Sequence, residues 1–201
     1  MADFNTRDPA RADFWDERYR AGVMPWDAGG VPPALDRCLP LALPARVLIP
    51  GCGRAYEAGW LLAQGFEVSA IDISAVALEQ ARAVLQEPAA ACVRQADFFA
   101  DDFGASFDWI YERAFLCALP PRLWTDWAAR CAALLRPGGR LAGYFVLADE
   151  LPAPRRGPPF VTTRDELAAL LAADFDLLEE VEVGETLPVF RGERWLVWVK
   201  R

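Results

Sequence analysis

Residues 45–72 read ARVLIPGCGRAYEAGWLLAQGFEVSAID, and this stretch decides the fold. The apolar run at 47–49 predicts a short buried strand, and a Gly-Cys-Gly turn follows it. A helical pattern then leads to a second apolar run, which ends in Asp72. A strand, a glycine turn, a helix and a second strand in this order predict half of a nucleotide-binding βαβ fold.

The glycine turn and the terminal carboxylate indicate which part of a nucleotide binds. Gly51 and Gly53 let the backbone turn tightly and approach a ligand where a Cβ atom would collide. The helix that follows directs free N–H groups toward that ligand. Asp72 lies 19 residues after Gly53, about the offset at which an acidic side chain accepts the hydroxyls of a ribose. Together they predict an adenosine ligand.

The residues after the turn separate the adenosine ligands. A dinucleotide fold needs a small residue where this chain has Tyr56, which disfavours a nicotinamide or flavin cofactor. No G-K-[ST] follows the glycines, which disfavours a nucleoside triphosphate. S-adenosylmethionine is the common adenosine ligand that remains.

Length and composition predict one domain over residues 1–201. The chain has 201 residues, of which 54% are hydrophobic, enough to bury a full core without a linker between two cores. No apolar run approaches the ~20 residues that span a bilayer. The N-terminal residues carry charges of both signs and no signal-peptide core, so we expect a cytoplasmic protein without membrane contact.

Charge and residue types exclude several functions. A net charge of −8 opposes nucleic-acid binding, which needs clustered cations. The chain has no histidine, so no Ser-His or Cys-His pair can form. The five cysteines are an odd number without a C-x-x-C pair, and we expect neither a metal site nor a disulfide framework. They are Cys38, Cys52, Cys92, Cys117 and Cys131.

Downstream of Asp72, strand and helix patterns continue to alternate. Helices are predicted at 75–86 behind an N-cap at Ser74, at 121–135 before the stop signal at 136–139, and through Ala172 behind a Thr163/Glu166 capping box. Strands are predicted at 92–96, 107–112, 141–147, 175–183 and 194–200. Repeated βα units predict a mostly parallel sheet with helices on both faces and a ligand at the strands' carboxyl ends.

A set of short motifs carries a family resemblance from about Phe14 to Lys200. In chain order they are FW at 14–15, MPWD at 24–27, IPGCG at 49–53, IDIS at 71–74, DFF at 97–99, YER at 111–113, ALP at 118–120, LRPGG at 135–139 and GPPF at 157–160. The chain resembles class I S-adenosylmethionine-dependent methyltransferases, specifically the thiopurine methyltransferase superfamily with its halide/thiol methyltransferase branch. The resemblance implies a single-domain, Rossmann-like fold with a seven-stranded sheet.

The resemblance also implies site residues. The segment 1–30 would cover the methyl donor through its aromatic residues, Gly51 would meet the donor's amino acid part, and Arg113 would act beside donor and acceptor as the catalytic residue. Asp72 would bind the ribose, and Asp97 with Phe98 the adenine. The complete implied donor site is Trp15, Tyr19, Trp26, Gly51, Cys52, Gly53, Asp72, Ile73, Asp97, Phe98, Glu112 and Arg113, with no metal.

Several of these residues have a structural alternative. The three aromatic side chains can face a sulfonium by cation–π attraction, or they can bury the first helix. Asp72 can instead be a charge at a helix N-terminus. Arg113 can be a surface ion-pair partner, and Glu112 can pair with it. Cys52 can have a lowered pKa near a helix N-terminus, or simply fill a tight turn.

A proline-rich loop at 149–160 contains Arg155 and Arg156. It can form a lid over the acceptor, with an arginine meeting an anion, or it can be a solvated connector.

We expect direct in-line methyl transfer to a small soft nucleophile, because a thiol, thiopurine, thiocyanate or halide needs little help from a base. Trp26-Asp27 resembles the halide/thiol branch and Tyr111-Glu112-Arg113 the thiopurine branch, so the acceptor class stays open. The alternatives are a nicotinamide-dependent oxidoreductase and a non-catalytic domain that binds S-adenosylmethionine or a protein. We expect a monomer or weak dimer.

Overall fold

The structure is a computed structural model that describes residues 4–37, 39, 42, 45–104, 106–184 and 187–201. In these residues a seven-stranded sheet has the order β3-β2-β1-β4-β5-β7-β6. The strands are β1 (Arg46–Pro50), β2 (Glu67–Asp72), β3 (Val93–Gln95), β4 (Phe107–Arg113), β5 (Leu135–Val146), β6 (Phe175–Glu182) and β7 (Glu193–Lys200). Strand β7 runs antiparallel to both of its neighbours, and the other pairs are parallel.

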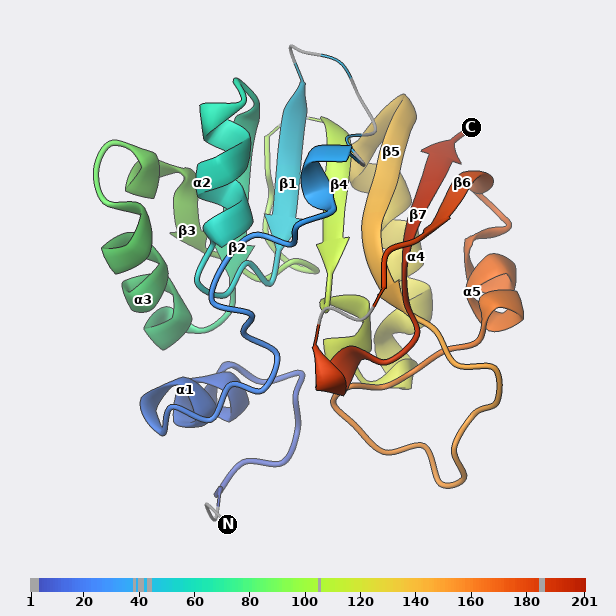
Figure 1. The fold of residues 1–201 in the computed structure, drawn as a ribbon, viewed down its shortest axis with the longest axis horizontal. Helices are drawn as coiled ribbons and strands as arrows, with labels where there is room; N and C mark the ends of the chain where they lie inside the picture. Colours follow the sequence, from blue (N-terminus) through green and yellow to red (C-terminus); the bar gives the residue numbers. More distant parts are fainter. Residues whose placement is uncertain (1–3, 38, 40–41, 43–44, 105, 185–186) are drawn as a thin grey trace.

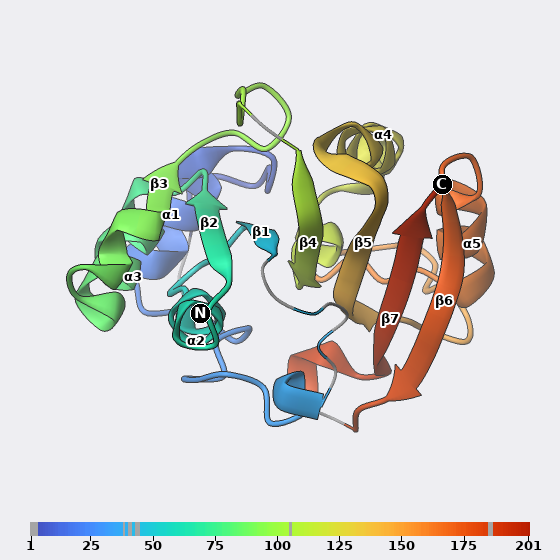
Figure 2. The ribbon, with the colours of Figure 1, turned by 90° about the horizontal axis from the view of Figure 1, so that it is seen from above.

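Helices cover both faces of this sheet (Figure 2). The α-helices are α1 (Ala12–Arg20), α2 (Tyr56–Ala63), α3 (Ala75–Leu85), α4 (Trp124–Leu134) and α5 (Arg164–Leu171). Short 3₁₀ turns are η1 (Leu35–Arg37), η2 (Ala89–Cys92), η3 (Leu116–Ala118), η4 (Pro121–Leu123) and η5 (Pro188–Phe190). The predicted class, a mostly parallel α/β sheet with helices on both faces, is therefore confirmed.

Two hydrophobic layers follow from the alternation of side chains along the strands. Leu48 and Ile110 pack on one face with α4 and α5, whereas Val47 and Trp109 pack on the other with α2 and α3. Trp109 is fully buried and donates its indole N–H to the carbonyl of Ala142 at 2.9 Å. This contact satisfies its polar atom and ties β4 to β5.

Helix α1 lies apart from these layers, beyond the carboxyl ends of β1 and β4 (Figure 1). It contacts α3, and the hydroxyl of Ser74 donates to the Asp16 carboxylate at 2.6 Å. Ser74 also caps α3 as predicted, since its Oγ accepts the N–H of Ala77 at 3.1 Å. One serine therefore begins α3 and holds α1 against the body.

Several predicted element boundaries need correction. The strand at 92–96 shortens to β3, because Cys92 ends a 3₁₀ turn. The helix at 121–135 begins at Trp124 after a separate 3₁₀ turn. The strand expected at 141–147 begins at Leu135, which pairs with Phe107; the register then shifts, and Arg140 pairs with Trp109. A chain that re-enters the sheet through a bulge is hard to predict, because the LRPGG stretch indicates only a helix stop.

The predicted capping box is half formed. Thr163 Oγ1 accepts the N–H of Glu166 at 3.1 Å, but the Glu166 carboxylate binds Thr162 and Arg155. A helix with the length and hydropathy of a membrane span is not found among the described residues. Cys38 and residues 1–3, which belong to the expectations above, lie outside the described residues.

Candidate active site

A cavity of about 570 Å³ opens at the carboxyl ends of β1, β2 and β4. This is within the range of small-molecule sites, roughly 300–1,000 Å³. The glycine turn, Asp72 and Arg113 line it from the three strand ends, and residues 157–159 and 189–190 complete the wall with the N-terminal segment. Every predicted site residue lines this cavity except Glu112.

The glycine turn needs glycine at both positions. Gly51 and Gly53 have φ angles of 60° and 53°, in the left-handed region that side chains disfavour. A Cβ atom on Gly51 would lie 2.7 Å from the Phe115 ring, and one on Gly53 would lie 2.9 Å from the Tyr19 hydroxyl. The turn therefore gives the cavity a backbone wall. Cys52 between them is buried, and burial raises the pKa of its thiol, so it fills the turn as a neutral residue.

Asp72, at the end of β2, contacts both the glycine turn and the start of α3. Its Oδ2 accepts the N–H of Gly53 at 3.0 Å, and its Oδ1 accepts the N–H of Ser74 at 2.9 Å. A carboxylate has about four acceptor positions, so Asp72 keeps acceptor capacity for a ligand. Burial raises the pKa of Asp72 to about 6 despite these two bonds. The two roles considered for Asp72 are therefore compatible in one side chain.

Three aromatic residues of the N-terminal segment form one cluster beside the turn. The Trp15 and Tyr19 rings both meet the Trp26 ring edge to face, at centroid distances of 5.4 and 6.0 Å. The indole N–H of Trp15 donates to the Pro9 carbonyl at 2.8 Å. Burial raises the pKa of Tyr19 strongly, so its hydroxyl stays protonated. All three rings line the cavity, and they also pack α1 against the body.

Arg113 is not a surface residue, because it forms an ion pair inside the cavity wall. Its Nη1 lies 2.7 Å from Oε1 of Glu57, which belongs to the first turn of α2. Only 10% and 11% of the two side chains are exposed. Burial disfavours the guanidinium charge, but the Glu57 carboxylate keeps the pKa of Arg113 above its ordinary value. Arg113 is therefore a fixed cation.

Glu112 is the one predicted donor residue that does not line the cavity. Its Oε1 accepts the N–H groups of Phe115 and Leu116 at 2.9 and 3.0 Å, and it does not pair with Arg113. Alternation along β4 directs Arg113 and Tyr111 to the cavity, so the residue between them points to the other face. Burial raises the pKa of Glu112 to about 8. Its role is to hold the turn after β4.

Asp97 and Phe98 lie at the cavity edge after β3. The Asp97 carboxylate accepts the N–H of Phe99 at 2.8 Å, which shapes the local turn. The Phe98 ring is buried and meets the Phe115 ring edge to face at 5.1 Å. Phe115 thus connects Phe98 with the glycine turn. Ile73 also lines the cavity, next to Asp72.

Sequence reasoning missed several cavity residues that act through pairing or packing. Glu57 holds Arg113, Phe115 covers Gly51, and Asp27 pairs with Arg54 at 3.1 Å. A signal existed for Glu57, because an acid in the first turn after a glycine turn lies close to a bound ligand. Phe115 and the Asp27 pair had no such signal.

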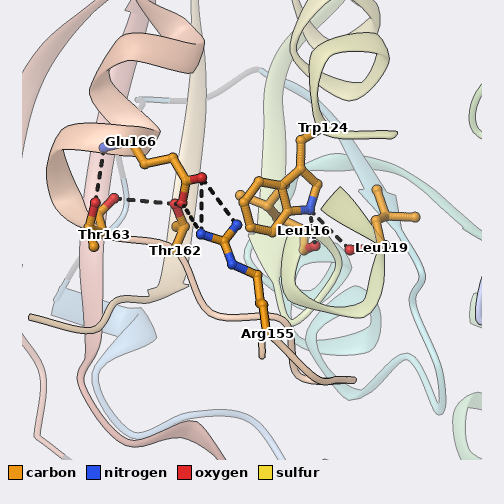
Figure 3. A network of polar contacts seen from close by, with 7 residues as sticks. All are labelled: Leu116, Leu119, Trp124, Arg155, Thr162, Thr163 and Glu166. Carbon is orange, nitrogen blue, oxygen red and sulfur yellow. Dashed lines mark hydrogen bonds and ion pairs between the residues drawn. The ribbon is translucent and has the colours of Figure 1, made fainter. Parts of the chain in front are cut away.

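The loop at 149–160 is held to the body by Arg155 (Figure 3). Its guanidinium donates to both carboxylate oxygens of Glu166 at 3.1 Å and stacks 5.1 Å from the Trp124 ring centroid. Arg155 therefore anchors the loop. Gly157, Pro158 and Pro159 line the cavity.

The cavity fits an adenosine-type methyl donor. It has the features such a ligand needs: a backbone turn without Cβ atoms, a carboxylate with free lone pairs at a strand end, and a cluster of aromatic faces. Among the described residues, no group of three potential ligands could hold a metal ion.

Comparison with solved structures places the fold among S-adenosylmethionine-dependent methyltransferases. A methyltransferase from Burkholderia thailandensis, solved with bound 1,6-didemethyltoxoflavin and S-adenosylhomocysteine, superposes with a TM-score of 0.76 at 25% identity over 99% of this chain and 93% of that chain. The chain belongs to the thiopurine S-methyltransferase (TPMT) family, whose sequence model matches residues 10–199.

Two relatives are similar to this chain over most of its length. The thiopurine S-methyltransferase of Pseudomonas fluorescens (strain SBW25) is 34% identical, with 90% of this chain and 89% of that protein covered. A probable thiol methyltransferase 2 of Arabidopsis thaliana is 29% identical, with 90% and 83% covered. The protein is thus an S-adenosylmethionine-dependent methyltransferase, which sets aside the nicotinamide-dependent oxidoreductase and the non-catalytic domain.

Proposed function

We propose that the protein methylates a small soft nucleophile, a thiol, thiopurine, thiocyanate or halide, by direct in-line displacement. The observation that carries this proposal is an apolar cluster in the cavity wall next to Arg113. Its members that line the cavity are Cys117 and Phe190, with Trp26, Ala114 and Val189 packed against them. A polarisable acceptor loses little hydration when it enters such a surface, whereas a strongly hydrated one loses much.

The charged groups of the cavity also favour an acceptor that brings its own electron pair. The acids lining it in the described residues are all engaged: Asp27 with Arg54, Glu57 with Arg113, and Asp72 and Asp97 with two backbone N–H groups each. Burial raises the pKa of the Cys117 thiol, so it stays protonated. Positioning and exclusion of water are then the main contributions of the protein.

Each predicted donor residue that lines the cavity receives a role in this proposal. Asp72 accepts the ribose hydroxyls, and Asp97 with Phe98 borders the adenine. Gly51, Cys52, Gly53 and Ile73 supply the backbone surface on which the donor lies. The bound donor supplies a methyl group on a sulfonium sulfur, and Trp15, Tyr19 and Trp26 present their aromatic faces to that cation and exclude water.

Arg113 is the residue we place beside the reacting atoms, where it orients the acceptor. The segment 4–30 covers the donor, and the loop at 149–160 borders the acceptor through Gly157, Pro158 and Pro159.

Release of S-adenosylhomocysteine across a panel of acceptors tests the proposal. The panel contains thiophenol, a thiopurine, thiocyanate, sulfide, iodide and phenol. We expect the sulfur acceptors or iodide to be turned over faster than phenol. A preference for phenol, or no release from samples in which calorimetry confirms donor binding, would contradict the proposal.

We further propose a cytoplasmic protein that acts on a small molecule, as a monomer or weak dimer and without nucleic acid. The net charge of −8 supports the last point, and the free thiols of Cys52, Cys92, Cys117 and Cys131 fit a reducing compartment. Analytical ultracentrifugation and cell fractionation test these statements.

A further inference from the structure

The charges of the Glu57–Arg113 ion pair affect a ligand that binds beside them in the cavity. Both side chains line the cavity, and both are about nine-tenths buried, with exposed fractions of 11% and 10%. Charges with so little water around them are screened weakly by solvent and salt. The charge balance of this pair therefore affects the affinity for a charged acceptor more than a surface pair does.

Arg113 faces a second carboxylate as well as Glu57. Glu193, the first residue of β7, is 4% exposed and interacts electrostatically with the Arg113 guanidinium. Burial raises the pKa of Glu193 to about 7. The Arg113 guanidinium thus interacts with two carboxylates, from α2 and β7, and the local charge is neutral or negative.

The location of Glu57 gives this charge balance a chemical consequence. Tyr111 and Arg113 lie on the same face of β4, and the Tyr111 hydroxyl is 3.5 Å from the Glu57 oxygen that holds Arg113. An anion that approaches the guanidinium therefore meets the Glu57 carboxylate at the same place. An uncharged thione or thiol has no such repulsion to overcome.

We propose that Glu57 is a specificity-determining residue that neutralises Arg113 and makes the enzyme favour uncharged soft acceptors over anionic ones. The inference rests on the proposed function, because it divides the acceptor class named there by charge. In this role, Glu57 positions Arg113 and weakens the attraction of the guanidinium for an anionic acceptor.

The test compares thiocyanate, an anion, with 1-methylimidazole-2-thione, a neutral thione. Glu57→Gln keeps an oxygen that accepts the Arg113 N–H but removes the carboxylate charge. We expect the ratio of kcat/KM for thiocyanate to kcat/KM for the thione to rise about tenfold or more. A ratio within about twofold of the unsubstituted enzyme, in a folded variant, would overturn the inference.

Two further variants show whether the effect is local. Glu67→Gln removes a carboxylate of the same type from an exposed ion pair with Arg46 at the amino end of β2, and it should leave the ratio unchanged. Arg113→Gln should lower the ratio, because it leaves the Glu57 charge unopposed. The Glu57→Gln/Arg113→Gln double variant should return the ratio to near that of the unsubstituted enzyme.

If Glu57→Gln does not fold, the double variant still provides the test, because it removes the charges of both Glu57 and Arg113. The ratio should then be about tenfold higher in the double variant than in Arg113→Gln, and equal ratios would overturn the inference.

Thiocyanate binding to the S-adenosylhomocysteine complex provides a measurement without turnover. Calorimetry should show about tenfold tighter binding to Glu57→Gln than to the unsubstituted enzyme. If neither acceptor is methylated by any variant, the proposed function fails, and this binding difference still decides the role of Glu57. Equal binding in the two proteins would reject that role.

Discussion

The carboxylate of Asp72 holds the backbone of Gly53. Its Oδ2 atom accepts the Gly53 N–H at 3.0 Å, while Oδ1 accepts the N–H of Ser74 at 2.9 Å. The last residue of β2 therefore connects the turn after β1 with the N-cap of α3. The acid that we expect to bind the ribose also fixes the turn on which the donor lies.

Replacing Asp72 should weaken donor binding in two ways. Asp72→Ala removes the ribose acceptor and releases the Gly53 N–H, so we expect a loss of about 1.5–3 kcal/mol, or roughly ten- to hundredfold in affinity. Calorimetry with S-adenosylhomocysteine measures it. Asp176→Ala is the control, because that exposed acid pairs with Arg201 outside the cavity. Unchanged donor affinity in Asp72→Ala would reject the role.

Donor affinity should decrease as the pH is lowered, because Asp72 becomes protonated. Burial raises the pKa of Asp72 to about 6 from an ordinary value of 3.8, so the carboxylate becomes protonated as the pH falls through 6. A protonated acid accepts fewer hydroxyl bonds, and affinity at about pH 5 should be roughly tenfold below that at pH 8. Asp72→Asn should bind weakly at both pH values and lose this dependence. An equal slope in both proteins would assign it to another group.

Glu112 should make the folded protein less stable at high pH. Burial raises its pKa to about 8 in the folded state, above the ordinary 4.5. Its contribution to stability is therefore complete below about pH 4.5 and is lost as the pH rises through 8. Relative to Glu112→Gln, the unsubstituted enzyme should lose on the order of a few kcal/mol of unfolding free energy between about pH 5 and 9.

Urea denaturation at several pH values measures that difference. Asp72 and Glu193, whose pKa values burial also raises, are present in both proteins and cancel in the comparison. Parallel stability curves for the two proteins would mean that Glu112 does not titrate in this range.

The central part of the site could be predicted because it is local in sequence. A strand, a glycine turn and a terminal acid within residues 45–72 determine the Gly53–Asp72 contact. The partner of Arg113 could not be predicted in this way, because Glu57 is 56 residues away and on a different element. Such a pair depends on how α2 packs on the sheet, which sequence periodicity does not specify.

The position of Glu112 outside the cavity lining could not be predicted for a different physical reason. Strand β4 is buried on both faces, so its residues do not alternate between apolar and polar in a way that reveals the cavity side. Both Glu112 and Arg113 end this strand, and sequence alone gives no means to separate them. The buried carboxylate becomes explicable only when the N–H groups of Phe115 and Leu116 are seen to need a partner.

Arg155 should keep the loop at 149–160 in place. Arg155→Gln removes the double hydrogen bond to Glu166 and the stacking on Trp124, so we expect faster hydrogen exchange in this loop and a higher KM for the acceptor. The matched control is Arg156→Gln, since the neighbouring arginine is exposed. Mass spectrometry of hydrogen exchange compares the two. Equal exchange in both variants would show that the anchor does not hold the loop.

Gly51→Ala should impair donor binding through Phe115. Gly51 has a φ of 60°, so a side chain there costs about 1–2 kcal/mol of backbone strain. A Cβ atom would also lie 2.7 Å from the Phe115 ring, which must move to make room. Gly104→Ala is the matched control, because Gly104 has a φ of 69°, has nothing within 4 Å of an added Cβ and does not line the cavity. Gly51→Ala should lose more unfolding free energy than the control in urea denaturation, because it adds the contact with Phe115 to the backbone strain, and only Gly51→Ala should lose donor affinity, by about tenfold. Adding Phe115→Leu to Gly51→Ala should recover part of that affinity by making room for the methyl group. Similar donor affinities in the two glycine variants would show that backbone strain, and not the contact with Phe115, is the reason for glycine in this turn.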